Sequence, residues 1–164
     1  MSCLPVSVRS LLVILVVWLG MLLCSSPAQA AKDPYISQYL RVTEPVAVDL
    51  DGQGQTQMFA PEDFAVGKNL FENNCKNCHL VGATLPNPPV SLSLAALQGA
   101  VPQRDNINNL VDYLRQPMTY DGTEENYVCR QVSEHWLPQA QVEKLAAFIL
   151  RAAQKAPGWG TSDF

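Results

Sequence analysis

Two cysteines and a histidine stand in the order C-x-x-C-H, at Cys75, Cys78 and His79. This order and spacing are the attachment signature of a c-type haem. Each thiol adds across one vinyl group of the porphyrin, and the imidazole of the next residue then reaches the iron from the same side of the ring. The pattern predicts one covalently bound haem c, attached through Cys75 and Cys78, with His79 as the proximal iron ligand.

Two other kinds of site use a C-x-x-C pair. A thioredoxin-like redox pair belongs in a βαβ context, which the surrounding sequence lacks. A zinc site needs two further ligands at short spacing, and none follows the motif. Haem attachment is therefore favoured over both alternatives.

The first thirty residues have the pattern of an export signal. Arg9 precedes an apolar run over residues 11–23, and small residues then lead to an A-x-A cleavage site that ends at Ala30. The apolar run is shorter than the roughly 20 residues of a membrane-spanning helix, so a cleaved signal is favoured over an uncleaved anchor. A lipid anchor on Cys24 is also disfavoured, because a leucine precedes it instead of a small residue. We therefore predict a signal peptide over residues 1–30.

The chain has 164 residues and a formal net charge of −4, which becomes −5 when Arg9 leaves with the signal. This mild negative charge argues against nucleic acid as a partner. Export agrees with the motif, because c-type haem is attached outside the cytoplasm. The prediction is an exported protein that is peripheral to the membrane after signal removal.

An N-terminal extension over residues 31–60 is expected to contain a β-hairpin. Residues 46–50 alternate apolar and polar side chains, residues 51–54 are turn formers, and residues 55–59 return as a second strand. A lone hairpin is only marginally stable in water. We therefore expect this hairpin to pack on the haem domain or on a partner.

The remaining residues, 61–164, are predicted to form a mostly α cytochrome c haem domain with a C-terminal tail. Pro61 suits the first position of a helix that runs into the C-x-x-C-H motif. Asp105 is the expected cap of a second helix that stops at residue 117, and a third helix is expected over residues 138–154. The expected buried side chains are Phe64, Leu70 and Phe71, then Ile107, Leu110, Val111 and Leu114, and finally Val142, Leu145, Ala146, Ile149 and Ala153.

Two further segments allow two interpretations each. The stretch over residues 80–103 is rich in proline and small residues and is expected to be a loop. Within it, Pro88 or a neighbour is a candidate to accept a hydrogen bond from Nδ1 of His79, unless the loop only covers the surface. In the tail, Trp159 is either exposed as a docking residue or folded back on the domain.

Cys129 is left without a partner, because two cysteines leave with the signal and two are used by the haem. A covalent haem also needs an occupant for its second axial position, and the downstream candidates are Met118, Cys129 and His135. Met118 directly follows the end of a helix, and a lone methionine in a small domain more often serves packing.

Several sequence blocks resemble the extrinsic cytochrome c-550 family of cyanobacterial photosystem II. Besides the C-x-x-C-H run, they are Leu70-Phe71, Asn87-Pro88, PQRDNI at 102–107, LVDYL at 110–114 and PMTYDG at 117–122. The resemblance covers most of the mature chain. It implies a low-potential, monohaem, mostly helical cytochrome in the thylakoid lumen, with two axial histidines and with a hairpin and a tail that help it dock.

The chain departs from that family at the distal ligand. The family has Val-His after an acidic stretch, whereas this chain has Val128-Cys129 with one residue fewer. Cys129 therefore falls where the family has its second axial histidine. In this respect the chain resembles the cytochrome c-550-like paralogue more than the main subunit. We expect His79/Cys129 ligation, in which a deprotonated thiol stabilises ferric iron and lowers the potential. His135 is the alternative distal ligand.

Three functions are compatible with the predicted haem site and the family resemblance. The first is electron transfer in the thylakoid lumen, associated with lumenal subunits of photosystem II and an unknown redox partner. The second is a structural, stabilising subunit of photosystem II that replaces cytochrome c-550. The third is a haem-based redox or gas sensor, in which Cys129 dissociates on reduction. Enzyme activity is not expected, because the sequence offers no nucleophile with a base, no paired acids and no open metal triad.

Overall fold

A computed structural model describes residues 14–15, 33–80 and 90–161. By its internal contacts the chain divides into Met1–Ala31 and Lys32–Phe164, and the fold below is that of the second unit. Its order is α2 (Pro34–Gln38), β1 (Val46–Asp49), β2 (Thr56–Phe59), α3 (Pro61–Asn74), α4 (Leu94–Gly99), α5 (Ile107–Arg115) and α6 (Gln139–Lys155). None of the described helices is long and apolar enough to cross a bilayer. The predicted signal peptide lies outside the described residues except at positions 14 and 15.

The predicted hairpin is present. Strands β1 and β2 pair antiparallel, with Val46 opposite Phe59 and Asp49 opposite Thr56. The Asp49 carboxylate closes the turn by accepting the N–H of Gly52 at 2.7 Å, and Gly52 has a φ of 71°, which suits glycine. Val48 and Phe59 are buried against the helices, so the hairpin packs on the domain.

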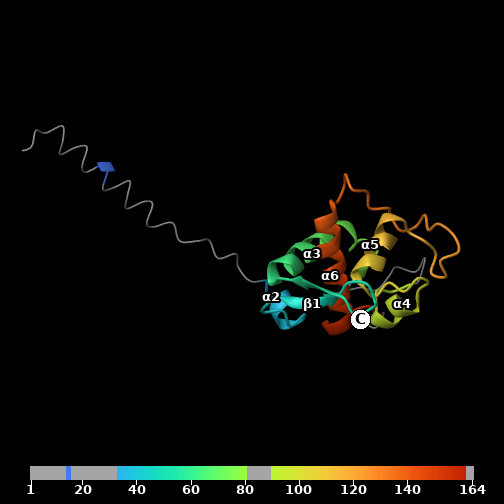
Figure 1. Cartoon of the computed structure of the whole chain (residues 1–164), viewed down its shortest axis with the longest axis horizontal. Coiled ribbons are helices and arrows are strands. Elements are labelled where there is room, and N and C mark those ends of the chain that lie inside the picture. Colours follow the sequence, from blue (N-terminus) through green and yellow to red (C-terminus); the bar gives the residue numbers. More distant parts are fainter. Residues whose placement is uncertain (1–13, 16–32, 81–89, 162–164) are drawn as a thin grey trace, which may run out of the picture. The chain divides into compact units, whose positions relative to one another are not determined.

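The centre of the fold is the pair of helices α3 and α6, which lie beside each other in Figure 1. Helix α3 begins at Pro61 as predicted and ends at its C-cap Cys75. Gly67 brings the backbone of α3 close to the backbone of α6 at Lys144. Apolar side chains fill the space around this crossing, and the rings of Phe71 and Phe148 are 5.6 Å apart.

The second predicted helix is α5, but its cap is Asn106 and not Asp105. The backbone of Asn106 is extended, and its side-chain oxygen accepts the N–H of Asn109 at 3.0 Å. Asn106 is also 2% exposed, so the domain fixes it in this role, whereas Asp105 lies one residue outside the helix. The predicted buried stripe of α5 is confirmed at Ile107, Leu110, Val111 and Leu114.

The third predicted helix is α6, which is buried more widely than one stripe predicts. It contacts α3, α5, α4 and β1, so its neighbours surround it on several sides. Leu70 of α3 and Ala153 of α6 are only half-buried, unlike the prediction. The additional buried residues of α6 are Ala147, Phe148, Leu150 and Ala152.

Two short helices were not predicted. Helix α4 interrupts the expected loop over residues 80–103, with Ser93 as its cap and Leu97 as its buried residue. Helix α2 follows the cap Asp33. Helices of five or six residues are not stable alone, so tertiary contacts must hold them.

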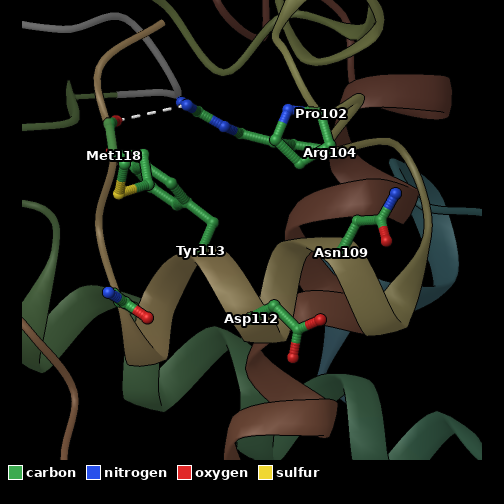
Figure 2. A pocket seen from close by; sticks show the side chains of 7 residues that line it. Pro102, Arg104, Asn109, Asp112, Tyr113 and Met118 are labelled. Atoms are coloured by element: carbon green, nitrogen blue, oxygen red, sulfur yellow. Dashed lines mark hydrogen bonds between the residues drawn. The ribbon is translucent and has the colours of Figure 1, made fainter. Parts of the chain in front are cut away.

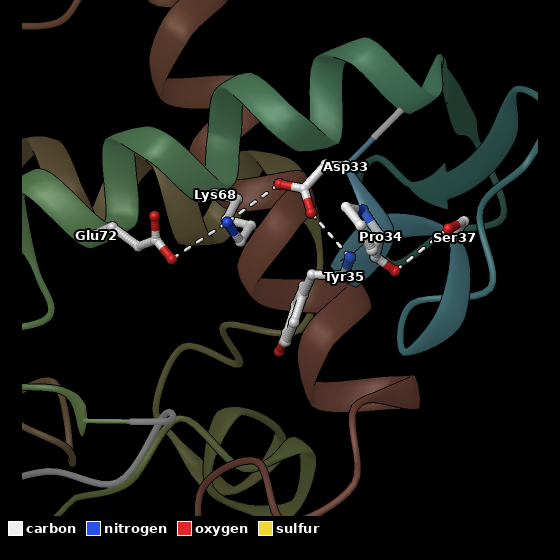
Figure 3. A network of polar contacts seen from close by, with 6 residues as sticks. All are labelled: Asp33, Pro34, Tyr35, Ser37, Lys68 and Glu72. Atoms are coloured by element: carbon white, nitrogen blue, oxygen red, sulfur yellow. Dashed lines mark hydrogen bonds and ion pairs between the residues drawn. The ribbon is translucent and has the colours of Figure 1, made fainter. Parts of the chain in front are cut away.

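A small polar network joins α2 to α3 (Figure 3). The Lys68 ammonium lies 3.1 Å from the Asp33 carboxylate and 3.2 Å from the Glu72 carboxylate. Asp33 also accepts the backbone N–H of Tyr35 at 2.8 Å, which caps α2. One carboxylate therefore both starts the short helix and fastens it to α3.

Trp159 folds back on the domain, so its interpretation as an exposed docking residue is wrong. Its side chain is 7% exposed and packs 5.2 Å from the Phe71 ring. The indole N–H donates to the carbonyl oxygen of Leu92 at 3.0 Å. The tail thus covers the core and holds the segment that leads into α4.

Candidate haem site

The predicted attachment residues lie in a tight turn at the end of α3. The N–H of Cys75 donates to the carbonyl oxygen of Phe71 at 2.8 Å, which completes the helix. The Cys75 carbonyl oxygen then accepts the N–H of Cys78 at 3.0 Å and that of His79 at 2.8 Å. These local bonds gather two thiols and an imidazole at one helix end.

Burial sets the protonation of these groups. It raises the pKa of the Cys75 thiol to about 12, and the neighbouring thiols of Cys129 and Cys78 add to this rise. Burial lowers the pKa of His79, which favours the neutral imidazole, the form that binds metal. The Cys75 thiol therefore stays neutral, and His79 favours the neutral form.

The same interactions reveal that Cys129 lies near the attachment motif. Its thiol raises the pKa of Cys75, and the Cys78 thiol raises the pKa of Cys129. These effects occur although 54 positions separate Cys75 from Cys129. Electrostatic influence between thiols falls off with distance, so these three side chains share one region. None of the three cysteines in the described part of the chain forms a disulfide.

A closed loop after α5 turns Cys129 inward. The N–H of Asn126 donates to the carbonyl oxygen of Pro117 at 2.8 Å, which closes the base of the loop. The side-chain oxygen of Asn126 then accepts the N–H of Val128 at 2.9 Å and that of Cys129 at 3.4 Å. Tyr127 and Val128 are 88% and 62% exposed, whereas Cys129 is half-buried. Of this run of three, only Cys129 faces the domain.

His135, the alternative ligand, has an exposed side chain in the segment before α6. Its neighbour Trp136 lies under the Arg130 guanidinium, 4.2 Å from ring centroid to Cζ, and Leu137 is buried.

Met118 is half-buried and pairs with Glu125 through an isolated β-bridge. Pro88 falls in residues 81–89, outside the described residues.

Arg104 and Tyr113 line a small recess beside this loop (Figure 2). Arg104 is 7% exposed, and its guanidinium lies 3.8 Å above the ring of Tyr113. The same guanidinium donates to the carbonyl oxygens of Met118 at 3.2 Å and Thr119 at 2.7 Å. The recess measures about 180 Å³, and Pro102, Asn109, Asp112, Gln116 and Met118 complete its wall.

Tyr113 and Arg104 also affect the pKa of Cys129. Burial raises the pKa of Cys129, while a hydrogen bond from Tyr113 and the charge of Arg104 oppose that rise. Neither residue was among the predicted site residues. Both residues belong to blocks that carry the family resemblance, but only their contacts reveal what they do.

The donor set fits a covalently attached haem. Two unbridged thiols and a neutral imidazole occur in one turn, in the order that attachment to porphyrin vinyl groups and to iron requires. A third thiol from a distant loop lies near them. With the helical pair α3 and α6, this arrangement defines a c-type cytochrome.

The comparisons with known proteins identify the family. The model of the cytochrome c-550 domain matches residues 38–164, so the chain belongs to the cytochrome c-550 family. It is 49% identical over 156 residues to the cytochrome c-550-like protein of Trichodesmium erythraeum, covering 95% of this chain and 94% of that protein. It is 54% identical over 135 residues to photosystem II extrinsic protein V of Gloeobacter violaceus, covering 82% and 73%.

A solved structure agrees with this assignment. The crystal structure of the PsbV2 cytochrome from Thermosynechococcus elongatus matches with a TM-score of 0.78 and 56% identity, over 80% of this chain and 100% of that one. The predicted fold class, a mostly α cytochrome c fold with an N-terminal β-hairpin, is confirmed. As a member of this family, the protein carries covalently bound haem c.

Proposed function

We propose that this chain is a low-potential electron carrier of the thylakoid lumen, associated with photosystem II. Cys75 and Cys78 would hold the haem, and His79 and Cys129 would bind its iron. When bound, the haem supplies a one-electron couple between ferric and ferrous iron. The chain's contribution is the donor set, in which an anionic sulfur favours the ferric state and lowers the potential.

The observation that carries the ligand proposal is the position of Cys129. Its side chain is half-buried and its thiol raises the pKa of Cys75, while the adjacent Tyr127 and Val128 are exposed. His135 is exposed and belongs to a segment held by other contacts. A thiol brought beside the motif by a closed loop is the better candidate for the second axial position.

Location and partner rest on the relatives and on the predicted export signal. The relative from Gloeobacter violaceus is named as an extrinsic protein of photosystem II, and relatives with this name support a lumenal site next to that complex. The relatives are named as cytochromes or photosystem subunits, which supports electron transfer over catalysis. Sequencing the N-terminus of the mature protein tests the cleavage after Ala30.

The deciding experiment is low-temperature EPR of the ferric holoprotein and of Cys129→Ser. We expect a low-spin signal of thiolate type that is lost in the variant. The matched control is His135→Ala, which removes the competing ligand and should leave the signal unchanged. A wild-type signal of bis-histidine type that disappears in His135→Ala would overturn the proposal and make His135 the ligand.

A structural role in photosystem II is the second candidate, favoured by the 54% identity to an extrinsic protein. Experiments in cells can distinguish electron transfer from a structural role. We expect deletion of the protein to impair photosystem II in both cases. Cys129→Ser should keep the attached haem but alter its potential, so it should impair the complex only when electron transfer is the function. Full activity with Cys129→Ser would support the structural role.

A further inference from the structure

Arg104 is a buried cation for which the described residues supply no carboxylate. Only 7% of this residue is exposed. The ion pairs found among the described residues use the ammonium groups of Lys68 and Lys144, and none includes Arg104. Burying a charge costs free energy unless an opposite charge or hydrogen bonds compensate for it. A guanidinium in this position is therefore suited to bind an anion.

The protein uses only part of this guanidinium. Nη2 donates to the carbonyl oxygens of Met118 at 3.2 Å and Thr119 at 2.7 Å, and the ring of Tyr113 stacks on it at 3.8 Å. A guanidinium has five N–H donors, so those on Nε and Nη1 remain. No fully buried side-chain nitrogen in the described part of the chain lacks a hydrogen-bond partner. The remaining donors of Arg104 therefore open on accessible space and not on a closed core.

That space is the recess of about 180 Å³ beside α5 (Figure 2). The side chains of Pro102 and Met118 give its wall an apolar part, Arg104 adds a positive charge and Asp112 adds a negative one. No ion pair among the described residues joins Arg104 to Asp112. Since one water takes up about 30 Å³ of liquid, the recess has room for a small ligand group next to the guanidinium.

The charges of the recess favour a carboxylate over a phosphate. A carboxylate carries one negative charge, which the single charge of Arg104 matches. A phosphate group carries up to about two negative charges at neutral pH and would leave an excess beside Asp112. Hydrogen bonds between a guanidinium and a carboxylate are also short and strong, because both partners are charged.

We propose that this recess is a carboxylate-binding site in which Arg104 holds the ligand through Nε and Nη1. Two sources offer this chemistry, a propionate arm of the covalently bound haem and a small free carboxylate. The stack on Tyr113 and the bonds to two backbone carbonyl oxygens hold the guanidinium in place, so the ligand meets a fixed donor. The site does not depend on whether Cys129 or His135 binds the iron.

Resonance Raman spectroscopy of the ferric holoprotein tests the first source. The propionate bending band reports hydrogen bonds to the propionate, and we expect Arg104→Lys to shift it, because lysine keeps the charge but loses the planar array of donors. The matched control is Arg130→Lys. Arg130 also stacks on an aromatic ring, 4.2 Å from the centroid of Trp136, but it does not line the recess, so the control should show the wild-type band.

Titration of nitrogen-15-labelled holoprotein with sodium acetate tests the second source, with sodium chloride at the same ionic strength as the reference. We expect a saturable NMR shift of the Arg104 side-chain N–H and of the backbone N–H of Tyr113. Arg104→Lys should weaken acetate binding about 10- to 100-fold, which is the range of a charge-assisted hydrogen bond. Arg130→Lys should bind acetate like the wild type.

Asp112→Asn keeps Arg104 in place and tests the same recess if Arg104→Lys yields no holoprotein. Asp112 is exposed, and its carboxylate repels an anion bound next to it. Its replacement should tighten acetate binding about 2- to 5-fold at low salt, or shift the propionate band. The matched control is Glu134→Gln, which removes an exposed carboxylate outside the recess and should change neither.

The outcomes identify the source and can also refute the site. A Raman shift in Arg104→Lys but not in Arg130→Lys assigns the recess to a haem propionate, and an acetate response that Arg104→Lys weakens assigns it to a free carboxylate. An acetate response of undiminished strength in Arg104→Lys would overturn the inference. So would a wild type without an acetate response whose propionate band is unchanged in Arg104→Lys and Asp112→Asn. An EPR spectrum that excludes Cys129 as a ligand overturns the ligation proposed above and leaves this site in place.

Discussion

Gly67 leaves no room for a side chain at the crossing of α3 and α6. It lies in the middle of α3, buried where this helix crosses α6. A Cβ atom at this position would lie 2.8 Å from the carbonyl carbon of Lys144 and 2.8 Å from Cβ of Phe148, and closer still to the Lys144 carbonyl oxygen. Since ordinary contact begins near 3.4 Å, Gly67→Ala must part the helices by at least about 0.6 Å.

The magnitude follows from two opposing effects. Overpacking of a well-packed interface costs about 1 to 3 kcal/mol, and the upper end applies because the obstacle is backbone that cannot rotate away. Alanine stabilises a helix interior by about 1 kcal/mol relative to glycine, because its helix propensity is higher. We therefore expect Gly67→Ala to lower the free energy of unfolding by about 2 kcal/mol.

The assay is denaturant unfolding of the holoprotein, followed by far-UV circular dichroism, with equal slopes required for the two proteins. Asn69→Ala is the matched control, because Asn69 is an exposed residue of the same helix and its replacement gains propensity without entering the interface. We expect the control to equal or exceed wild-type stability. A Gly67→Ala protein as stable as the wild type would refute the close helix crossing.

Three further predictions concern the parts that surround this crossing. Trp159→Phe removes the indole donor to a backbone carbonyl oxygen and should cost about 1 to 2 kcal/mol in the same assay. Lys68→Met breaks the ion pair with Asp33 and should cost at most about 1 kcal/mol, with the difference shrinking at high salt. The pKa of Asp121 is lowered from 3.8 by hydrogen bonds, first from the Thr119 hydroxyl, so its stabilisation is present above that pH and is lost as pH falls through the lower folded value. The difference in melting temperature between wild type and Asp121→Asn should accordingly shrink in acid, and a difference independent of pH would contradict this.

Local sequence signals predicted the main elements of the fold. Helices α3, α5 and α6 and the β-hairpin arise from apolar periodicity, proline positions and turn residues, all of which act within a few positions of the chain. For this reason the buried stripe of α5 was predicted correctly from Ile107 to Leu114. The resemblance to the cytochrome c-550 family was likewise carried by contiguous blocks of sequence.

Where the prediction erred, the deciding contacts join distant parts of the chain. Asn106 caps α5 in place of Asp105 because the domain buries it in an extended conformation. Helix α4 forms although its surroundings resemble a loop, since Leu97 is held in the core. Trp159 is buried because Phe71 and the carbonyl oxygen of Leu92 lie beside the tail. Sequence spacing contains no information about such neighbours.

The haem-attachment chemistry is readable from the sequence. Cys75, Cys78 and His79 predict it because they lie within five positions of each other, and local backbone bonds alone bring them into one turn. Which distant groups lie near this turn depends on the three-dimensional fold. The loop that carries Cys129 closes through the backbone at Pro117 and through the Asn126 side chain. The physical reason is that residues far apart in sequence meet only through the packing of helices and loops, which sequence spacing does not encode.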